Sequence, residues 1–173
     1  MPRPYAAALP IAYVVLRVLV VLNWLMGAAI LVLLLLSANA PWIVQAFKLA
    51  PSPETVRLIW GLRAVALLGL VAVPLNHVVL ARLTAMVRTV RAGDPFVAAN
   101  AARLTAIAWA LLALQLLGMV IGLIGQSVST PAQPLDLDAG FSITGWLAVI
   151  LTFVLARVFA EGALMRDDLE GTV

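Results

Sequence analysis

Long apolar runs separated by short polar segments dominate the pattern of hydrophobic and polar positions along the chain. A helix that crosses a bilayer needs about 20 mostly apolar residues, and a continuous apolar run satisfies its backbone groups in lipid only as a helix. The pattern therefore predicts an all-α membrane protein with a bundle of four transmembrane helices. The predicted spans are residues 11–37, 58–80, 104–124 and 141–159.

A helical period continues beyond the second span. Apolar residues recur at positions i, i+3, i+4 and i+7 in Leu83, Met86, Val87 and Val90. The pattern stops at Gly93, and the following Asp94-Pro95 is typical of an N-cap and the first residue of a new helix. We therefore expect the second and third helices to extend past the membrane as a cytoplasmic hairpin over residues 81–103, with Gly93 at its tip.

The segment between the first two spans predicts where the second helix begins. Ser52-Pro53-Glu54 is typical of an N-cap, a first helical residue and an acidic residue of the first turn. The second helix is therefore expected to begin outside the apolar layer. Residues 40–49 are expected to form a short helix on the bilayer surface, because several of their side chains are large and apolar.

Composition supports the same class and excludes others. Hydrophobic residues form 64% of the chain and charged residues 11%, whereas an ordinary soluble domain is about 45–50% apolar and about 25% charged. A soluble or disordered chain is thus excluded, and 173 residues fit one domain over 1–173. The chain has no cysteine and one histidine, which excludes disulfides, thiolate chemistry and multi-histidine sites, so we expect no metal or cofactor.

Basic residues indicate the orientation in the membrane. One side of the predicted topology holds seven arginines, namely Arg3, Arg82, Arg88, Arg91, Arg103, Arg157 and Arg166, and the other side holds only Lys48 and Arg57. Because basic residues accumulate on the cytoplasmic side of short loops, we expect both termini in the cytoplasm. The pI of about 10.2 then reflects topology and not direct binding to nucleic acid.

The segment after the fourth span, residues 160–173, is acidic, whereas the hairpin is basic. The acidic residues of this tail, against the single base Arg166, are Glu161, Asp167, Asp168 and Glu170. The hairpin has four arginines, Arg88 and Arg91 among them, against Asp94. Opposite charges on one side of the membrane would let the tail dock on the hairpin. The alternative is a basic loop and an acidic tail, each surrounded by solvent.

His77 lies in the second span, where an ionisable group is a functional candidate. One interpretation is a proton relay or a single axial ligand. The other is a neutral imidazole that bonds to backbone groups freed by Pro74, one turn earlier, where the helix is expected to bend.

Two arginines also lie inside the spans. Arg17 is expected either to pair with Glu161 of the fourth helix or to extend to the lipid headgroups. Arg63 is expected to extend towards the outer surface, and the alternatives are an anion site or a pairing with Asp136 or Asp138.

The uncharged polar residues of the spans allow two interpretations. Asn23 and Gln115 fit hydrogen bonds between helices, or they line a transport path. Gly118 and Gly122 form a GxxxG pattern, which fits close helix packing within one chain or between the chains of a homo-oligomer.

Two segments of the chain resemble a known family. Gly-Asp-Pro-Phe-Val-Ala-Ala-Asn-Ala-Ala-Arg-Leu at 93–104 resembles the central motif of the DUF2975 family, and residues 158–173 resemble its C-terminal motif. The matching positions are Pro95, Phe96, Asn100 and Leu104, and then Phe159, Gly162, Thr172 and Val173. The tail here reads Glu-Gly-Thr-Val where many relatives have Glu-Leu-Thr-Val.

The resemblance implies a small protein of the bacterial cytoplasmic membrane with four helices and no established activity. It also implies a possible protein partner, because family members often occur beside a small helix-turn-helix regulator. We therefore expect a non-catalytic regulatory or sensory protein that acts through its hairpin and acidic tail. The alternative is an oligomeric transporter or channel for ions or small solutes. An enzyme is disfavoured, because no nucleophile and base are spaced for catalysis.

Overall fold

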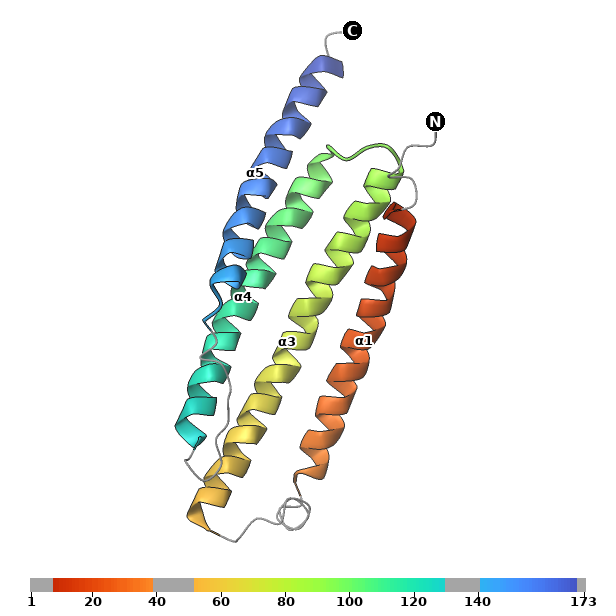
Figure 1. The fold of residues 1–173 in the computed structure, drawn as a ribbon. Coiled ribbons are helices and arrows are strands. Elements are labelled where there is room, and N and C mark those ends of the chain that lie inside the picture. Colours follow the sequence, from red (N-terminus) through yellow and green to blue (C-terminus); the bar gives the residue numbers. More distant parts are fainter. Residues whose placement is uncertain (1–7, 39–51, 130–140, 171–173) are drawn as a thin grey trace.

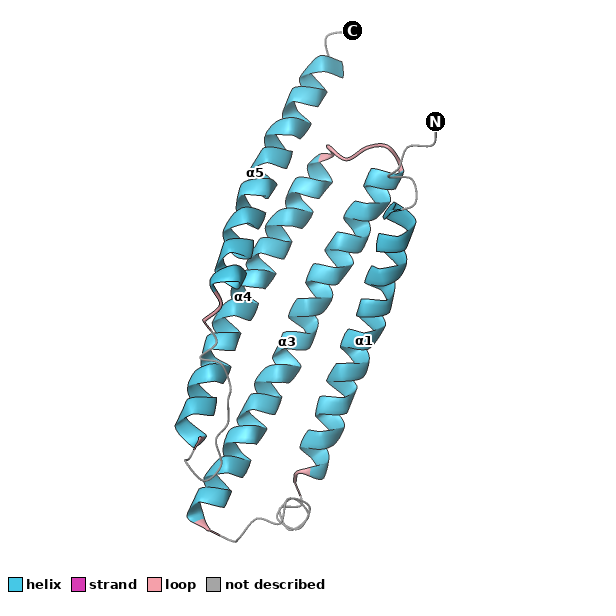
Figure 2. Cartoon of the chain, viewed as in Figure 1, coloured by secondary structure: helices cyan, strands magenta, loops and turns pink. Residues whose placement is uncertain are grey.

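Four long helices make up most of the chain (Figure 1). The computed structural model describes residues 8–38, 52–129 and 141–170. The helices are α1 (Ala8–Leu36), α3 (Pro53–Arg91), α4 (Ala98–Val128) and α5 (Ile143–Glu170). Between them the described ranges contain loops and turns but no strand (Figure 2). Each helix is long and apolar enough to cross a membrane, which confirms the all-α class and gives four candidate spans.

The beginning of α3 follows the predicted pattern. Ser52 is the N-cap, its hydroxyl accepts a hydrogen bond of 3.2 Å from the backbone N–H of Thr55, and Pro53 is the first helical residue. The helix then continues without a break through Pro74. The predicted surface helix at residues 40–49 and the loop acids Asp136 and Asp138 lie outside the described residues.

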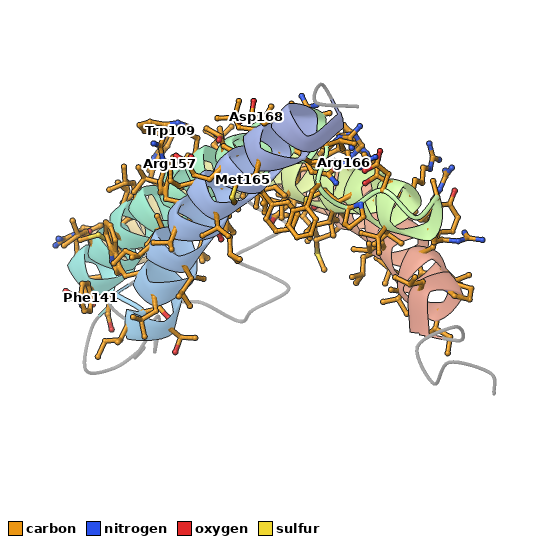
Figure 3. All side chains as sticks on the ribbon, turned by 90° about the horizontal axis from the view of Figure 1, so that it is seen from above. Trp109, Phe141, Arg157, Met165, Arg166 and Asp168 are labelled. Carbon is orange, nitrogen blue, oxygen red and sulfur yellow. The ribbon has the colours of Figure 1, made fainter. Side chains whose placement is uncertain are left out.

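The helices form a row and not the predicted bundle. Within the described ranges, α1 packs against α3, α3 against α4 and α4 against α5, and no other pair of helices is in contact. Seen along the helices, the row is bent, with α1 and α5 at its two ends (Figure 3). An open row is possible in a membrane because lipid tails cover an apolar helix face as well as another helix would. Gly27 is accordingly the one buried residue of α1 among those described.

Small residues let neighbouring helices approach closely. A Cβ atom added at Gly27 of α1 would lie 3.0 Å from both methyl groups of Val73 of α3. A Cβ atom added at Gly61 of α3 would lie 2.6 Å from a methyl group of Val128 of α4. These two glycines therefore fix how α1 and α4 sit on the two sides of α3.

α5 is displaced along the helix axis relative to α4. Gly145, near the beginning of α5, lies against the side chain of Gln115, which is in the middle of α4. The far end of α5 projects past the turn between α3 and α4 (Figure 1). Residues 160–170 therefore continue the helix and do not form a separate tail. The turn between α3 and α4, the beginning of α1 and the end of α5 all lie at the same end of the helices. We call it the hairpin end.

Candidate functional site

The turn between α3 and α4 is the first part of the candidate site. Gly93 follows the C-cap of α3, Ala92, and has a φ of 86°, a left-handed conformation that glycine adopts without steric cost. Its N–H donates to the carbonyl of Val90 at 3.1 Å, and the N–H of Asp94 donates to the carbonyl of Thr89 at 3.0 Å. Gly93 thus lies at the tip of the hairpin, as its position after the apolar pattern predicts.

The predicted restart of the helix at Asp94-Pro95 is wrong. α4 begins at Ala98, with Val97 as its N-cap, and residues 94–97 are not helical. The physical reason is that Asp94 and Pro95 have other partners. The Asp94 carboxylate binds a side chain of α5, and the carbonyl of Pro95 accepts a hydrogen bond from Asn100.

Asn100 holds the turn together from inside. Its side chain is fully buried, and its Nδ2 donates to the carbonyl of Pro95 and to the hydroxyl of Thr89, both at 2.8 Å. Its Oδ1 accepts a hydrogen bond of 2.7 Å from the guanidinium of Arg103. The Thr89 hydroxyl in turn donates to the carbonyl of Met86 at 2.8 Å. One amide therefore ties the end of α3, the turn and the first turns of α4 to each other.

The end of α5 docks on this turn. Arg166 forms an ion pair with Asp94, and both side chains are half-exposed. The rings of Phe96 and Phe159 are 5.3 Å apart between centroids. A Cβ atom added at Gly162 would lie 3.0 Å from Cδ1 of Phe96, so the missing side chain leaves room for that ring. Figure 3 shows Arg166 on the side of α5 towards α3, away from Trp109.

The tail and the hairpin therefore meet, but not through the charges that the sequence suggests. The pair joins the one acid of the hairpin, Asp94, to the one base of the tail, Arg166. Glu161 instead pairs with Arg157 of its own helix at 2.6 Å. Asp168 is exposed, and the side chain of Asp167 lies outside the described set.

Three arginines near the hairpin end, one on α1 and two on α3, surround the ring of Tyr13. The guanidinium carbons of Arg17, Arg88 and Arg91 lie 5.5, 5.6 and 5.7 Å from the centroid of its ring. The predicted pairing of Arg17 with Glu161 is wrong, because α1 and α5 are not in contact.

The polar residues inside the spans bond to neighbouring helices. The indole N–H of Trp24 donates to Nδ1 of His77 at 3.2 Å, and Asn23 donates to the carbonyl of Val73 at 3.0 Å. The imidazole therefore has a partner on α1, and the predicted bond to backbone groups freed by Pro74 is not the one formed. Gln115 donates to the carbonyl of Ser142 at 3.3 Å, just before α5.

Arg63 binds the C-terminal end of α1, at the end of the helices away from the hairpin end. Its Nε donates to the hydroxyl of Ser37 at 3.3 Å, its Nη2 donates to the carbonyl of Ser37, and its guanidinium lies 5.1 Å from the centroid of the Trp60 ring. Arg63 thus binds the C-terminal end of a neighbouring helix, where a cation is favourable, and does not extend alone towards the outer surface. In the part of the chain that the structure describes, no three acidic or histidine side chains gather as metal ligands do.

Comparison with known proteins identifies the family of this chain. The family described as "Protein of unknown function (DUF2975)" matches residues 45–173, which include the turn, Asn100 and all of α5. The chain belongs to the DUF2975 family. No curated protein and no solved structure matches it.

The two motifs that resemble DUF2975 meet in this DUF2975 protein. Pro95, Phe96 and Asn100 come from the central motif, and Phe159 and Gly162 come from the C-terminal one. Leu104 of the central motif is buried in α4 one turn below Asn100, while Thr172 and Val173 lie outside the described residues. The candidate site is therefore one structure built from two distant segments of the sequence.

Sequence reasoning missed several residues of this DUF2975 protein. Thr89 and Arg103 complete the bonds of Asn100, and Trp24 and Tyr13 bind the polar side chains of α3. Tyr13 and Arg103 had a local signal, because Tyr13 precedes Arg17 by four residues and Arg103 follows Asn100 by three, and such pairs are neighbours on a helix surface.

Proposed function

We propose that this DUF2975 protein is a non-catalytic regulatory or sensory protein of the bacterial cytoplasmic membrane, whose hairpin end faces the cytoplasm and binds a protein partner. The orientation rests on the excess of arginine at the hairpin end. The observation that carries the proposal is the docking of α5 on the turn through Asp94 with Arg166 and through Phe96 with Gly162.

This docking links the membrane to the proposed partner surface. α5 is one continuous helix from its apolar half to Glu170, so a shift of α5 in the membrane would move its polar end and the contacts of Phe96 together. Side chains at that end include the exposed acids Glu161 and Asp168. An acidic surface complements the basic surface of a DNA-binding protein, and charge complementarity steers association. The helix-turn-helix regulators found beside family members have that chemistry.

The test is co-purification of the full chain from membranes together with a helix-turn-helix regulator of the kind that occurs beside family members. An Asp94→Arg variant and an Arg166→Asp variant should each lower the recovered regulator, because like charges push α5 off the turn. The double variant, in which the charges are exchanged, should restore it. A half-exposed ion pair contributes about 0.2–1 kcal/mol, so each variant should remain folded.

A matched control is Arg157→Gln on the same helix, which breaks an ion pair within α5 and leaves the turn untouched. Recovery of the regulator with this variant should equal that of the unchanged protein. Equal recovery from all of the Asp94 and Arg166 variants, or no recovery of the regulator with the unchanged protein, would show that the proposal is wrong.

An oligomeric transporter or channel has less support. Asn23, His77 and Gln115, the polar residues that would line a path, are already bound to neighbouring helices. The four described helices form a single row, which encloses no path between them.

A further inference from the structure

Tyr13 lies among three arginine side chains at the hairpin end of α1 and α3. Its hydroxyl oxygen accepts hydrogen bonds from Nε of Arg17 at 3.1 Å and from Nη2 of Arg88 at 3.2 Å. Arg91 adds its guanidinium carbon at 5.7 Å from the centroid of the Tyr13 ring. We call these four residues the Tyr13 cluster.

Among the described residues, the Tyr13 cluster brings three positive charges together, and none of its arginines forms an ion pair with an acid. Two ion pairs of the described residues, Arg157 with Glu161 and Arg166 with Asp94, both involve α5. Glu161 lies on α5, which is not in contact with α1 or α3, and the Asp94 carboxylate is bound to Arg166. Three guanidinium groups around one ring repel each other, and an anion between them would reduce this repulsion.

The Tyr13 cluster is open to its surroundings. Of the four described helices, only α3 is in contact with α1, and Arg17, Arg88 and Arg91 are all exposed. Nitrogen-tipped side chains project from the α1–α3 end of the row in Figure 3. A ligand can therefore approach from the lipid side as well as from water.

The depth of the Tyr13 cluster matches the lipid headgroups. Arg88 follows Leu80, the last residue of the predicted second span, by eight residues, which is about 12 Å of helix. Side chains on a helix lean towards its N-terminus, so Arg88 and Arg91 of α3 lean back towards the bilayer. On α1, Tyr13 lies two residues inside the first predicted span, so the two helices together place the Tyr13 cluster at the boundary between the hydrocarbon core and the polar layer that flanks it.

We propose that the Tyr13 cluster binds the phosphodiester headgroup of an anionic phospholipid. Guanidinium groups bind phosphate oxygens through paired N–H donors, and arginine fits this geometry better than lysine. Tyr13 uses one donor of Arg17 and one of Arg88, which fixes both groups and leaves their other N–H donors for the phosphate. The lipid is favoured over free phosphate because α1 is exposed to lipid along most of its length. The inference is independent of the proposed protein partner.

The experiment measures lipid binding by the full chain in a nonionic detergent, by native mass spectrometry during titration with phosphatidylglycerol. Phosphatidylcholine and inorganic phosphate are titrated in parallel. We expect phosphatidylglycerol to bind more tightly than either. Arg88→Gln should weaken its binding about fivefold, the effect of removing one basic residue from an anionic lipid surface.

Two variants separate a defined site from general attraction between charges. Arg82→Gln removes an arginine from the same helix, outside the Tyr13 cluster, and should change the affinity less than twofold. Tyr13→Phe keeps the net charge but removes the hydroxyl that positions the arginines, and it should weaken binding severalfold. Helix content by circular dichroism confirms that each variant is folded, and Arg17→Gln replaces Tyr13→Phe if that variant does not fold.

Three results would overturn the inference. Equal losses with Arg82→Gln and Arg88→Gln, together with no loss in the variant that lacks the Tyr13 hydroxyl, would show general attraction between charges. Equal binding of phosphatidylcholine would show that the negative charge is not recognised. Binding of inorganic phosphate as tight as that of phosphatidylglycerol would show a site for a free anion.

Discussion

Replacing Asn100 by alanine removes three hydrogen bonds from the interior of the hairpin turn. The amide donates to Pro95 and to Thr89, and it accepts from Arg103. The side chain has no exposed surface, so water cannot replace these bonds without opening the turn. The change should therefore destabilise the turn and leave the apolar contacts of the helices in place.

The size of the effect follows from the partners. A neutral hydrogen bond contributes about 1 kcal/mol to stability and one to a charged group about 1.5–3 kcal/mol. Thr89 keeps its bond to Met86, and the half-buried guanidinium of Arg103 can turn towards water, so part of the loss is recovered. The carbonyl of Pro95 loses the amide that binds it. We expect a net loss of about 2–4 kcal/mol in the free energy of opening the turn.

Amide hydrogen exchange on the purified protein measures this free energy. The N–H groups of Gly93 and Asp94 donate within the turn and report its opening. A loss of about 2–4 kcal/mol corresponds to exchange that is about 30- to 700-fold faster. Amides in the middle of α1 should exchange as before.

Asn76→Ala provides the matched control, because Asn76 is an exposed asparagine of α3 with no side-chain hydrogen bond among the described residues. Its loss should leave exchange at the turn unchanged. Unchanged exchange at Gly93 and Asp94 after Asn100→Ala would refute the reasoning, as would an equal increase after both substitutions.

The remaining predictions concern contacts between helices. Gly162→Leu should displace the ring of Phe96 and cost about 1–2 kcal/mol of stability in a denaturant titration. Gly162→Ala should cost less than half of that, because the ring then needs to move by only a few tenths of an ångström. Trp24→Phe removes the donor to the imidazole of α3, and the same titration should show a loss of about 0.5–1 kcal/mol; no loss would mean that this bond contributes nothing. The chain lacks cysteine, so pairs of cysteines can be introduced without removing any. A short bifunctional thiol reagent should not cross-link cysteines placed at positions 17 and 161, because α1 and α5 are not in contact. It should cross-link cysteines placed at positions 96 and 162, which are adjacent. Efficient cross-linking of the first pair would contradict the open row.

Local features of the sequence were enough to predict the four helices and the two ends of α3. Ser52 and Pro53 begin α3 because their own backbone and side-chain geometry favours a helix start. Gly93 ends the hairpin helix because only glycine adopts its conformation easily. The restart at Asp94 was predicted from equally local signals, yet a contact with α5 prevents it.

The partners of the charged and polar side chains depended on the tertiary structure. Asp94 and Arg166 are far apart in the sequence, and so are Tyr13 and Arg88. Opposite charge alone favoured several pairings, including the one of Arg17 with the fourth helix, which the row of helices does not allow.

By itself, the sequence determined that this protein has four apolar helices in a membrane, because the length and hydrophobicity of a run fix that outcome residue by residue. Only the tertiary structure decided that the helices form a row, that α5 docks on the turn and that three arginines surround Tyr13. The physical reason is that lipid solvates every apolar face equally, so hydrophobicity does not specify which helices are neighbours. That choice depends on close contacts such as Gly27 with Val73 and on a few hydrogen bonds between helices.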